Sequence, residues 1–250
     1  VPLYWRFEEK PKRIQGIPER YDFIFDYDHE LDLYIEPRSS DLLEILEKIY
    51  LEEANIGYMI DGNNLGNSYG SDYSKYIEKF INFSKNKTIV DVGCGGCKLL
   101  ENFSLKGINV MGVDPSPVAL NAGKEKNINI KNEFLNENTL EPESVNYITQ
   151  MDVMEHVFDP VKILIDERKA IKNDGIIFIN VPNCESSIEL GDISMLIHQH
   201  VNMYTRKSLT KVVEKAGLYV YDMSLSNYGS AIYCAITKNP LLKKYSSDDF

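Results

Sequence analysis

The sequence is poor in cysteine, in positive charge and in long apolar runs, and each shortage narrows the class of protein. Its four cysteines are mostly far apart, which is typical of reduced thiols, so we expect a cytoplasmic protein. Cys94-Gly-Gly-Cys97 matches C-x-x-C only formally, because no second pair supplies the other ligands of a zinc site. No apolar run approaches the roughly 18–20 residues that span a bilayer, and no secretory signal is visible. With 27 basic against 38 acidic residues, the net charge of −11 argues against nucleic acid as a substrate.

What the sequence does have is the composition of an ordinary α/β protein. Hydrophobic residues make up 43% and charged residues 26% of its 250 positions, enough for one full α/β domain and a modest extra segment. The chain begins at Val1 rather than Met, which leaves open whether residues are missing upstream.

The first part of the sequence, residues 1–85, is predicted to form a mainly helical N-terminal cap. Aromatic and polar residues alternate over 21–27, which favours a strand or an extended arm. Apolar residues recur at helical spacing over 40–54 and over 71–83, and a loop rich in Gly and Asn separates these two predicted helices.

A strand–helix repeat begins at Lys87 and predicts a main domain over 86–240, followed by a tail over 241–250. Near-continuous apolar runs are typical of strands buried on both faces of a parallel sheet. A polar insertion over 183–203 precedes a helix, and Asn227-Tyr-Gly229 predicts the turn of a C-terminal hairpin. We therefore predict an α/β fold with a seven-stranded Rossmann-like doubly wound sheet, parallel with an antiparallel C-terminal hairpin strand. The predicted strands are 88–92, 109–113, 128–131, 145–149, 175–180, 218–225 and 230–237, and the predicted helices are 96–106, 117–126, 158–172 and 205–216.

The most informative motif is the glycine turn that follows the first strand of this domain. Gly93 and Gly95 let the backbone turn tightly and approach a ligand closely. Asp114 ends the next strand, where its carboxylate can accept hydrogen bonds from both ribose hydroxyls of a nucleoside. A dinucleotide fingerprint needs a third glycine where this chain has Lys98, so another nucleoside cofactor fits better than NAD. The alternative is that these are plain turn glycines and that Asp114 caps the following helix.

Together with downstream segments, this turn resembles the class I S-adenosylmethionine (SAM)-dependent methyltransferases, over residues 87–238. The segment 154–160 is similar to the family's Leu-Glu-His-Val-x-Asp-Pro run, and 170–175 to its Leu-Lys-Pro-Gly-Gly run. Asn132-Glu133 stands where the family usually has Gly-Asp beside the adenine. The resemblance implies SAM as the cofactor, bound by Asp91, Gly93, Cys94, Gly95, Asp114, Pro115, Glu133, Phe134, Gln150 and Met151.

The segment His198-Gln199-His200, within the insertion, supplies the candidate catalytic residues. It follows the fifth strand of the predicted sheet, and such sheets bind ligands at the carboxyl ends of their strands. It resembles the His-Glu-His segment of sugar C-methyltransferases; because Gln199 cannot take a proton, O-methylation is favoured. His200 is the candidate general base, with His198 orienting it or binding substrate; the alternative for His200 is a structural role. His156 is predicted to help structure a helix entry. No metal site is predicted, since no clear acidic third ligand is near His198 and His200 in sequence.

Five further residues are candidates for binding the acceptor. Tyr69 and Tyr73 precede the first strand of the domain, where tyrosines of the resembling sugar enzymes approach the cofactor or acceptor; at helical spacing the alternative is a core position. Asn183 follows the fifth strand and is placed to hold an acceptor hydroxyl. Tyr204 and Arg206 follow the histidines, and Arg206 either binds an anionic group or lies at a solvated helix start.

The sequence therefore predicts a SAM-dependent methyltransferase that O-methylates a small metabolite. A sugar, a nucleotide-linked sugar or a phosphoryl-containing precursor of a capsule or surface polysaccharide is the first expectation, including a capsular O-methyl phosphoramidate. The alternatives are N- or C-methylation of a small molecule, an NAD-dependent oxidoreductase, and an inactive nucleoside-binding protein. A homodimer is compatible with the sequence, whereas a nucleic-acid partner and a membrane span are not expected.

Overall fold

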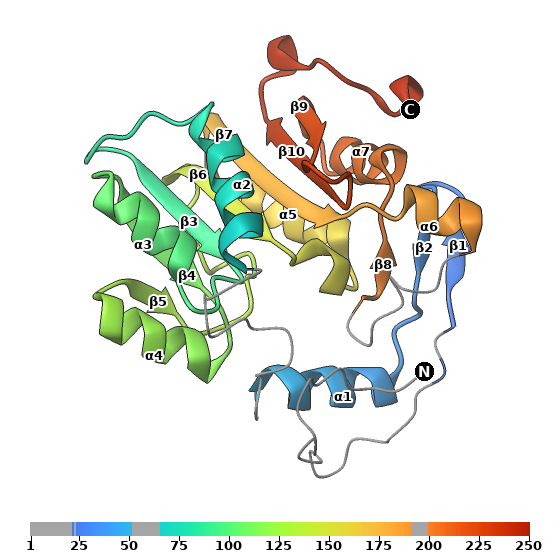
Figure 1. Ribbon diagram of the computed structural model, residues 1–250, viewed down its shortest axis with the longest axis horizontal. Helices are drawn as coiled ribbons and strands as arrows, with labels where there is room; N and C mark the ends of the chain where they lie inside the picture. The colour runs from blue at the N-terminus through green and yellow to red at the C-terminus, as the bar shows by residue number, and fades with distance from the viewer. Residues whose placement is uncertain (1–21, 23, 52–65, 192–199) are drawn as a thin grey trace.

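The computed structural model describes residue 22 and residues 24–51, 66–191 and 200–250, which include the whole predicted domain except part of the insertion. Its centre is a seven-stranded sheet in the order β5-β4-β3-β6-β7-β10-β9 (Figure 1). The strands are β3 (Thr88–Val92), β4 (Asn109–Val113), β5 (Asn129–Lys131), β6 (Val145–Met151), β7 (Ile171–Pro182), β9 (Tyr219–Leu225) and β10 (Ala231–Thr237).

The pairing of these strands confirms the predicted doubly wound sheet. Strands β5, β4, β3, β6 and β7 run parallel, whereas β10 pairs antiparallel with both β7 and β9. The chain winds outward from β3 in one direction through β4 and β5, and in the other through β6 and β7. The strand order therefore reverses between β3 and β6, and ligands of such sheets bind at that point, outside the carboxyl ends of the strands.

Two helical layers cover the sheet. On one face α2 (Gly66–Glu78) and α3 (Lys98–Leu105) pack through Tyr73, Tyr76, Ile77 and Phe103 against strand residues such as Ile89 and Phe178, with α4 (Pro117–Lys126) packing beside α3. On the other face α5 (Pro160–Ala170) and α7 (Arg206–Lys215) pack through Leu164, Leu209 and Val212 against residues such as Val90 and Ile177. Neighbouring residues of one strand thus enter opposite cores, which explains the continuous apolar runs in the sequence.

The helix starts follow from local capping chemistry. Ser116 precedes Pro117 and accepts a hydrogen bond from the backbone N–H of Ala119 at 3.2 Å. Asp159 precedes Pro160 in the same way and accepts from the backbone N–H of Lys162 at 2.9 Å. A side-chain acceptor at the N-cap with proline in the first turn satisfies otherwise unpaired backbone donors, so these starts agree with the sequence to within two residues.

The main departure from the predicted boundaries is at the start of β7. The sequence predicts a helix up to residue 172 and a strand from residue 175, but the strand begins at Ile171 and its pairing with β6 is irregular there. Val145 pairs with Ile171, and Tyr147 then pairs with Ile176, so extra residues of β7 bulge out. The glycine fits this bulge because a Cβ at Gly175 would lie 2.7 Å from the backbone oxygen of Asn146.

A second, three-stranded sheet joins the N-terminal segment to the end of the insertion. It consists of β1 (Asp26–Asp28), β2 (Leu33–Ile35) and β8 (Asn202–Met203), and α1 (Ser40–Leu51) follows β2. Tyr34 pairs with Met203, and the backbone N–H of Glu36 donates to Val201 O at 2.8 Å. The described part of the insertion also contains α6 (Glu185–Leu190). None of the described helices is long and apolar enough to cross a membrane.

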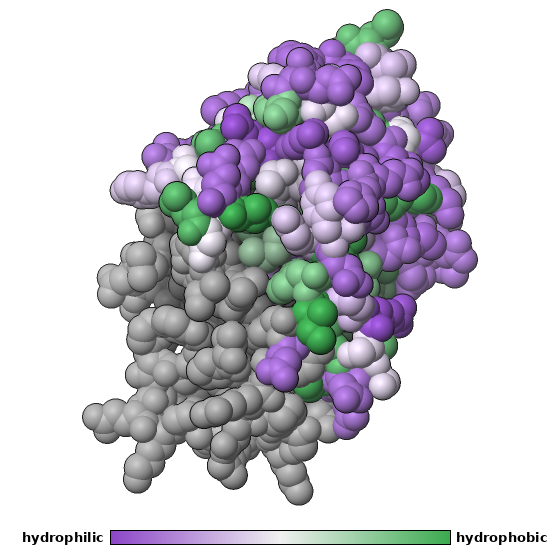
Figure 2. Space-filling model, turned by 90° about the vertical axis from the view of Figure 1, so that its right-hand side faces the viewer, coloured by the Kyte–Doolittle hydropathy of each residue, from purple (hydrophilic) through white to green (hydrophobic). Residues whose placement is uncertain are grey.

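The C-terminal tail packs on the domain through two short 3-10 turns, Pro240–Leu242 and Ser247–Asp249. The backbone N–H of Lys244 donates to Val220 O at 2.9 Å, and the Ser247 hydroxyl donates to Glu214 at 3.0 Å. The coloured part of the face in Figure 2 is mainly hydrophilic, with apolar residues interspersed among polar ones.

Candidate active site

The loop between β3 and α3 has a backbone that only glycine accommodates well. Gly93 has φ +72°, and a Cβ added there would lie 2.5 Å from Val153 Cγ2. Its N–H donates to Val113 O at 2.8 Å, which ties the loop to the end of β4. Gly95 also has positive φ, +44°. At Gly96 an added Cβ would meet nothing within 4 Å, so the loop faces open space at this position.

Asp114, at the end of β4, organises the polar groups next to this loop. Its side chain is 1% exposed, and its oxygens accept from the backbone N–H of Gly95 at 2.9 Å and of Ser116 at 2.8 Å. Asn132 donates to the backbone oxygens of Asp114 and Ser116 at 2.9 and 3.0 Å, which holds the end of β5 against β4. Each carboxylate oxygen retains the capacity for a second hydrogen bond, as a ribose diol would require.

The two cysteines of the loop act as small buried apolar groups. Cys94 and Cys97 are 7% and 0% exposed, with their sulfur atoms 4.0 Å apart. The Cys94 sulfur would lie 2.5 Å from a Cβ at Gly112 of β4, so this glycine makes room for it. All four cysteines of the chain are free and buried.

The other predicted cofactor residues divide into buried and exposed groups. Asp91 accepts from the Thr149 hydroxyl at 2.6 Å, and burial raises the pKa of Asp91 to about 7. Gln150 is fully buried, and its side chain donates to Glu167 of α5, so it supports the sheet interior. Glu133 and Phe134 are exposed after β5, whereas Pro115 and Met151 are half-buried at the ends of β4 and β6.

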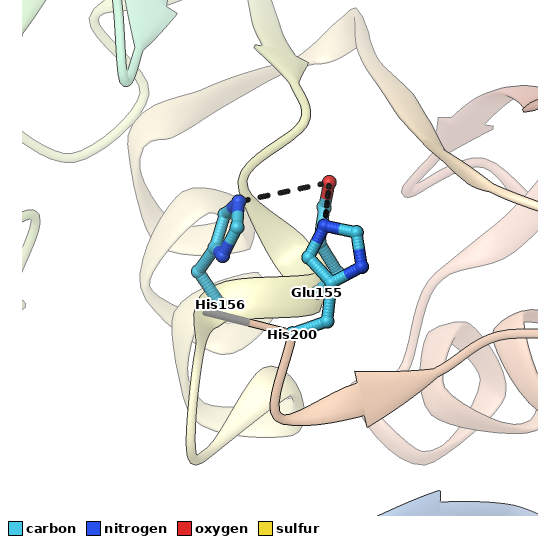
Figure 3. A group of neighbouring side chains, drawn as sticks. All are labelled: Glu155, His156 and His200. Carbon is cyan, nitrogen blue, oxygen red and sulfur yellow. Dashed lines mark ion pairs between the residues drawn. The ribbon is translucent and has the colours of Figure 1, made fainter. Parts of the chain in front are cut away.

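A second group of polar side chains follows β6, the strand next to β3. Figure 3 shows Glu155 and His156, on the 3-10 turn Met154–His156, together with His200, which precedes β8. His156 Nε2 lies 3.8 Å and His200 Nε2 3.9 Å from Glu155 Oε1, and the two imidazole rings are 5.1 Å apart. We refer to these three residues as the Glu–His–His cluster.

Backbone and side-chain hydrogen bonds hold His200 in this cluster. The residue after it, Val201, donates its N–H to Glu155 O at 2.8 Å. Asn202 then donates to Met154 O at 3.0 Å and to Val157 O at 2.6 Å. The segment 200–202 is therefore clamped to the 3-10 turn on one side, while β2 pairs with it on the other.

The carboxylate of Glu155 is buried without a hydrogen-bond donor from the described residues. This holds for both of its oxygens, and the side chain is 1% exposed. Burial, together with the nearby charge of Asp152, raises the pKa of Glu155 well above its ordinary value. His200 is 7% exposed, so the cluster is a poorly solvated group of proton acceptors close to the point where the strand order reverses.

The described candidates for acceptor binding all make contacts within the protein. Tyr73 donates to Gln150 O at 2.9 Å, and Tyr204 to Met154 O at 3.3 Å; both are fully buried. Asn183 donates to Gly229 O at 3.0 Å. Arg206 binds both carboxylate oxygens of Glu185, at 2.9 and 3.0 Å.

Three candidates lie beyond what the structure describes. His198 and Gln199 fall outside the described residues, and so does the side chain of Tyr69, although α2 includes its backbone. Conversely, the sequence interpretation gave Glu155 and Asn202 no role at the site. The signal for Glu155 was its place in the 154–160 segment, immediately before His156, whereas no sequence pattern identified Asn202.

The fold and the loop geometry are those of a SAM-dependent methyltransferase, and comparisons with known proteins agree. A family model described as a methyltransferase domain matches residues 68–222, more than half of the chain. The chain belongs to this family and is an enzyme that uses SAM.

Named relatives share part of the sequence. The ubiquinone biosynthesis O-methyltransferase of Hydrogenovibrio crunogenus is 27% identical over 195 residues, 70% of this chain and 75% of that protein. The one from Nitrosomonas europaea is 31% identical over 115 residues, 43% of this chain, so the match spans about half (49%) of that protein's length. Several other ubiquinone biosynthesis O-methyltransferases match over similar lengths, which makes O-methylation the activity shared by these names.

Solved structures support the fold. The mitomycin 7-O-methyltransferase MmcR superposes with a TM-score of 0.55 at 17% identity, over 70% of this chain and 55% of that one. A SAM-dependent methyltransferase from Aquifex aeolicus gives 0.54 at 18% identity, over 66% of this chain and 88% of that one.

Proposed function

We propose that this protein O-methylates a hydroxyl group of a small molecule, with His200 as the proton acceptor. The observation that carries the proposal is the Glu–His–His cluster, in which His200 Nε2 lies 3.9 Å from the buried Glu155 carboxylate. The cluster follows β6, which pairs with β3, the strand that leads into the loop with Gly93 and Gly95. In its ionised form, Glu155 favours the protonated form of the neighbouring imidazole and so strengthens His200 as a base.

SAM, when bound, supplies an electrophilic methyl group. We assign its binding to the loop from Gly93 to Gly96 and to Asp114, because the loop faces open space and Asp114 retains hydrogen-bonding capacity. The protein's own contribution is to hold the acceptor oxygen in line with that methyl group and to remove the oxygen's proton.

The charges near the cluster favour a neutral hydroxyl over a phosphoryl acceptor. Arg206, the predicted anion-binding residue, is paired with Glu185, and Lys207 is paired with Asp32 at 2.8 Å. A phosphoryl oxygen would need a free cationic clamp, while a hydroxyl needs a base. We therefore favour a hydroxyl-bearing sugar or another small hydroxyl compound over the phosphoramidate as the acceptor. The names of the relatives add ubiquinone precursors to the panel of acceptors that should be tested.

N- or C-methylation on the same fold is the alternative. An amine acceptor needs less help from a base once it is neutral, so it would depend less on His200. NMR of the methylated product identifies the atom that carries the new methyl group and decides between these reactions.

The test is a panel of acceptors with isotopically labelled SAM, followed by His200→Asn on the best acceptor. We expect turnover to fall by about 10²–10⁴-fold, with S-adenosylhomocysteine affinity retained. His29→Asn is the matched control, because His29 is exposed and contacts only Tyr27 among the described aromatic rings. Unchanged turnover in His200→Asn would reject the proton-acceptor role.

Two broader expectations accompany this function. Four free, buried thiols support a cytoplasmic location. The edge strand β5 offers a pairing surface for the predicted homodimer, and light scattering on the purified protein would test it.

A further inference from the structure

The Glu–His–His cluster contains the donor set of a metal site. Glu155, His156 and His200 each offer one ligand atom, and these three atoms all lie within 4.8 Å of one another. Figure 3 shows both imidazoles turned toward the carboxylate oxygen. Two imidazole nitrogens and one carboxylate oxygen match the ligand type and number of catalytic zinc sites, which keep a fourth position open.

A second, independent observation is the state of the Glu155 carboxylate. It is 1% exposed, and no described residue donates a hydrogen bond to either of its oxygens. The nearest imidazole nitrogens, at 3.8 and 3.9 Å, are beyond hydrogen-bond length. Burying an unpaired carboxylate costs several kcal/mol or more, so buried carboxylates are normally paired or coordinate a metal.

We propose that Glu155, His156 and His200 bind a divalent transition-metal ion of the zinc type, with an open position for the acceptor hydroxyl. The inference rests on the proposed O-methylation of a hydroxyl, and it gives His200 the role of a metal ligand in place of that of proton acceptor. Nitrogen donors favour zinc and its transition-metal neighbours over Mg²⁺ and Ca²⁺, which prefer oxygen ligands.

The distances from the carboxylate oxygen to the two imidazole nitrogens suit such an ion after a small adjustment. Bonds of about 2.0–2.2 Å in tetrahedral geometry place neighbouring ligand atoms about 3.3–3.5 Å apart. The two carboxylate–imidazole distances, 3.8 and 3.9 Å, need to close by a few tenths of an ångström. The clamp from Val201 and Asn202 to the 3-10 turn holds the backbones on either side at this spacing.

The metal would change how the acceptor loses its proton. The acceptor hydroxyl binds the open position, its pKa falls, and its proton passes to water. The resulting metal-bound alkoxide forms the new C–O bond with the methyl carbon while the C–S bond breaks and sulfur keeps that electron pair. The products are the methyl ether, the neutral thioether S-adenosylhomocysteine and one proton. Neither oxidant nor reductant is needed.

The sequence predicts no metal site because no clear acidic ligand stands close to His198 and His200 in the chain. The fold supplies one from a distant segment, since β8 and the 3-10 turn after β6 are hydrogen-bonded to each other. Glu155 and His156 stand far from His200 in the sequence, so the three can be identified as one ligand set only once this contact is known.

The test uses the untagged full chain, stripped with a chelator and titrated with Zn²⁺ alone. We expect one zinc per chain by elemental analysis, and calorimetric affinity that falls at least about 100-fold in Glu155→Gln and in the His156→Asn/His200→Asn double variant. His29→Asn and Glu125→Gln, at exposed positions, should bind zinc as the wild type does. S-adenosylhomocysteine affinity and thermal unfolding without zinc verify that the variants are folded.

The outcomes separate this inference from the proposed function. X-ray absorption showing two imidazoles and oxygen ligands at about 2.0–2.2 Å supports the site. Wild-type protein that binds no zinc, or cluster variants that bind it as tightly as the wild type, overturn the inference. If stripped enzyme without zinc still methylates a hydroxyl at full rate, the metal inference fails and the proposed function stands. If zinc binds at the cluster but no hydroxyl compound is methylated, the site stands and the proposed function fails.

Discussion

The loop after β3 and the Glu–His–His cluster follow neighbouring parallel strands, yet their polar groups are satisfied differently. At the loop, both oxygens of Asp114 accept backbone hydrogen bonds, and the partners come from Gly95 and Ser116. At the cluster, Glu155 is equally buried but has no such donor among the described residues. The Asp114 carboxylate therefore has hydrogen-bond partners before a ligand arrives, whereas the Glu155 carboxylate would gain a partner by binding a cation or a proton.

The two regions also differ in how the chain builds them. The loop depends on one continuous motif and the end of the next strand, linked by a single crossover. The cluster depends on Val201 and Asn202 reaching back to a 3-10 turn that follows β6. Binding of the cofactor and activation of the acceptor should therefore fail independently when each region is altered.

The strongest way to break the loop is Gly93→Val. The substitution forces a branched residue into φ +72° and places Cβ 2.5 Å from Val153 Cγ2. We expect affinity for S-adenosylhomocysteine, measured by calorimetry, to fall at least about 100-fold, which corresponds to roughly 3 kcal/mol. Gly107→Val is the control, since it has φ +85° but open space around an added Cβ. Equal loss of affinity in both variants would show that backbone strain, rather than the loop, is responsible.

Asp114→Ala tests how much the carboxylate next to this loop contributes to cofactor binding. It removes the acceptor for the Gly95 and Ser116 N–H groups as well as the proposed ribose contacts. We expect cofactor affinity to fall about 10–100-fold, at the scale of one or two charge-assisted hydrogen bonds. Zinc binding at the cluster should be unchanged in the same protein. Cofactor affinity at the wild-type level would remove Asp114 from the cofactor site.

Asn202→Ala tests the cluster without changing any of its three members. The substitution removes two hydrogen bonds to the 3-10 turn, at 3.0 and 2.6 Å, and so loosens the position of His200. We expect kcat to fall about tenfold because misplacement of a reacting group lowers the rate, while cofactor affinity stays the same. Asn227→Ala, at the exposed hairpin turn, is the control. A larger effect on cofactor affinity than on kcat would contradict the separation of the two regions.

The smallest expected effect on activity concerns a buried carboxyl that serves neither region directly, and that changes stability instead. Burial raises the pKa of Glu167 to about 8, so between its unfolded value of 4.5 and 8 the folded chain holds a proton that the unfolded chain releases. Stability therefore falls as pH rises through this range. Glu167→Gln is always neutral, and at pH 8.5 it should be more stable than the wild type by about 1–3 kcal/mol, or several degrees in Tm. Glu125→Gln, which is exposed, should leave the pH dependence of Tm unchanged.

The sequence predicted the central domain well because its signals are local. The strands buried on both faces, the Ser116-Pro117 and Asp159-Pro160 helix starts and the glycine turn all depend on neighbouring residues. The start of β7 was missed because its bulge is set by pairing with β6, which no local pattern records. The roles assigned to individual site residues, and the boundary at residue 85, stay predictions.

The acceptor region was predicted less completely for the same physical reason. His200 was identified as a candidate, but its neighbours Glu155 and His156 come from a segment that the sequence analysis treated separately. Hydrogen bonds from Val201, Asn202 and Tyr204 bring these segments together. Tyr73 and Tyr204 show the converse, because residues proposed to face the acceptor are fully buried with backbone partners.

The pairing of β2 with β8 has a consequence for protein engineering. Because Tyr34 pairs with Met203 and the Glu36 N–H donates to Val201 O, strand β2 is part of the support for His200. A chimera that imports only the region around His200 from another methyltransferase would lack the strand that pairs with this region and supports it. Exchange of acceptor preference between such enzymes therefore calls for the transplantation of two segments at once, residues 26–36 and residues 200–204, as a matched pair.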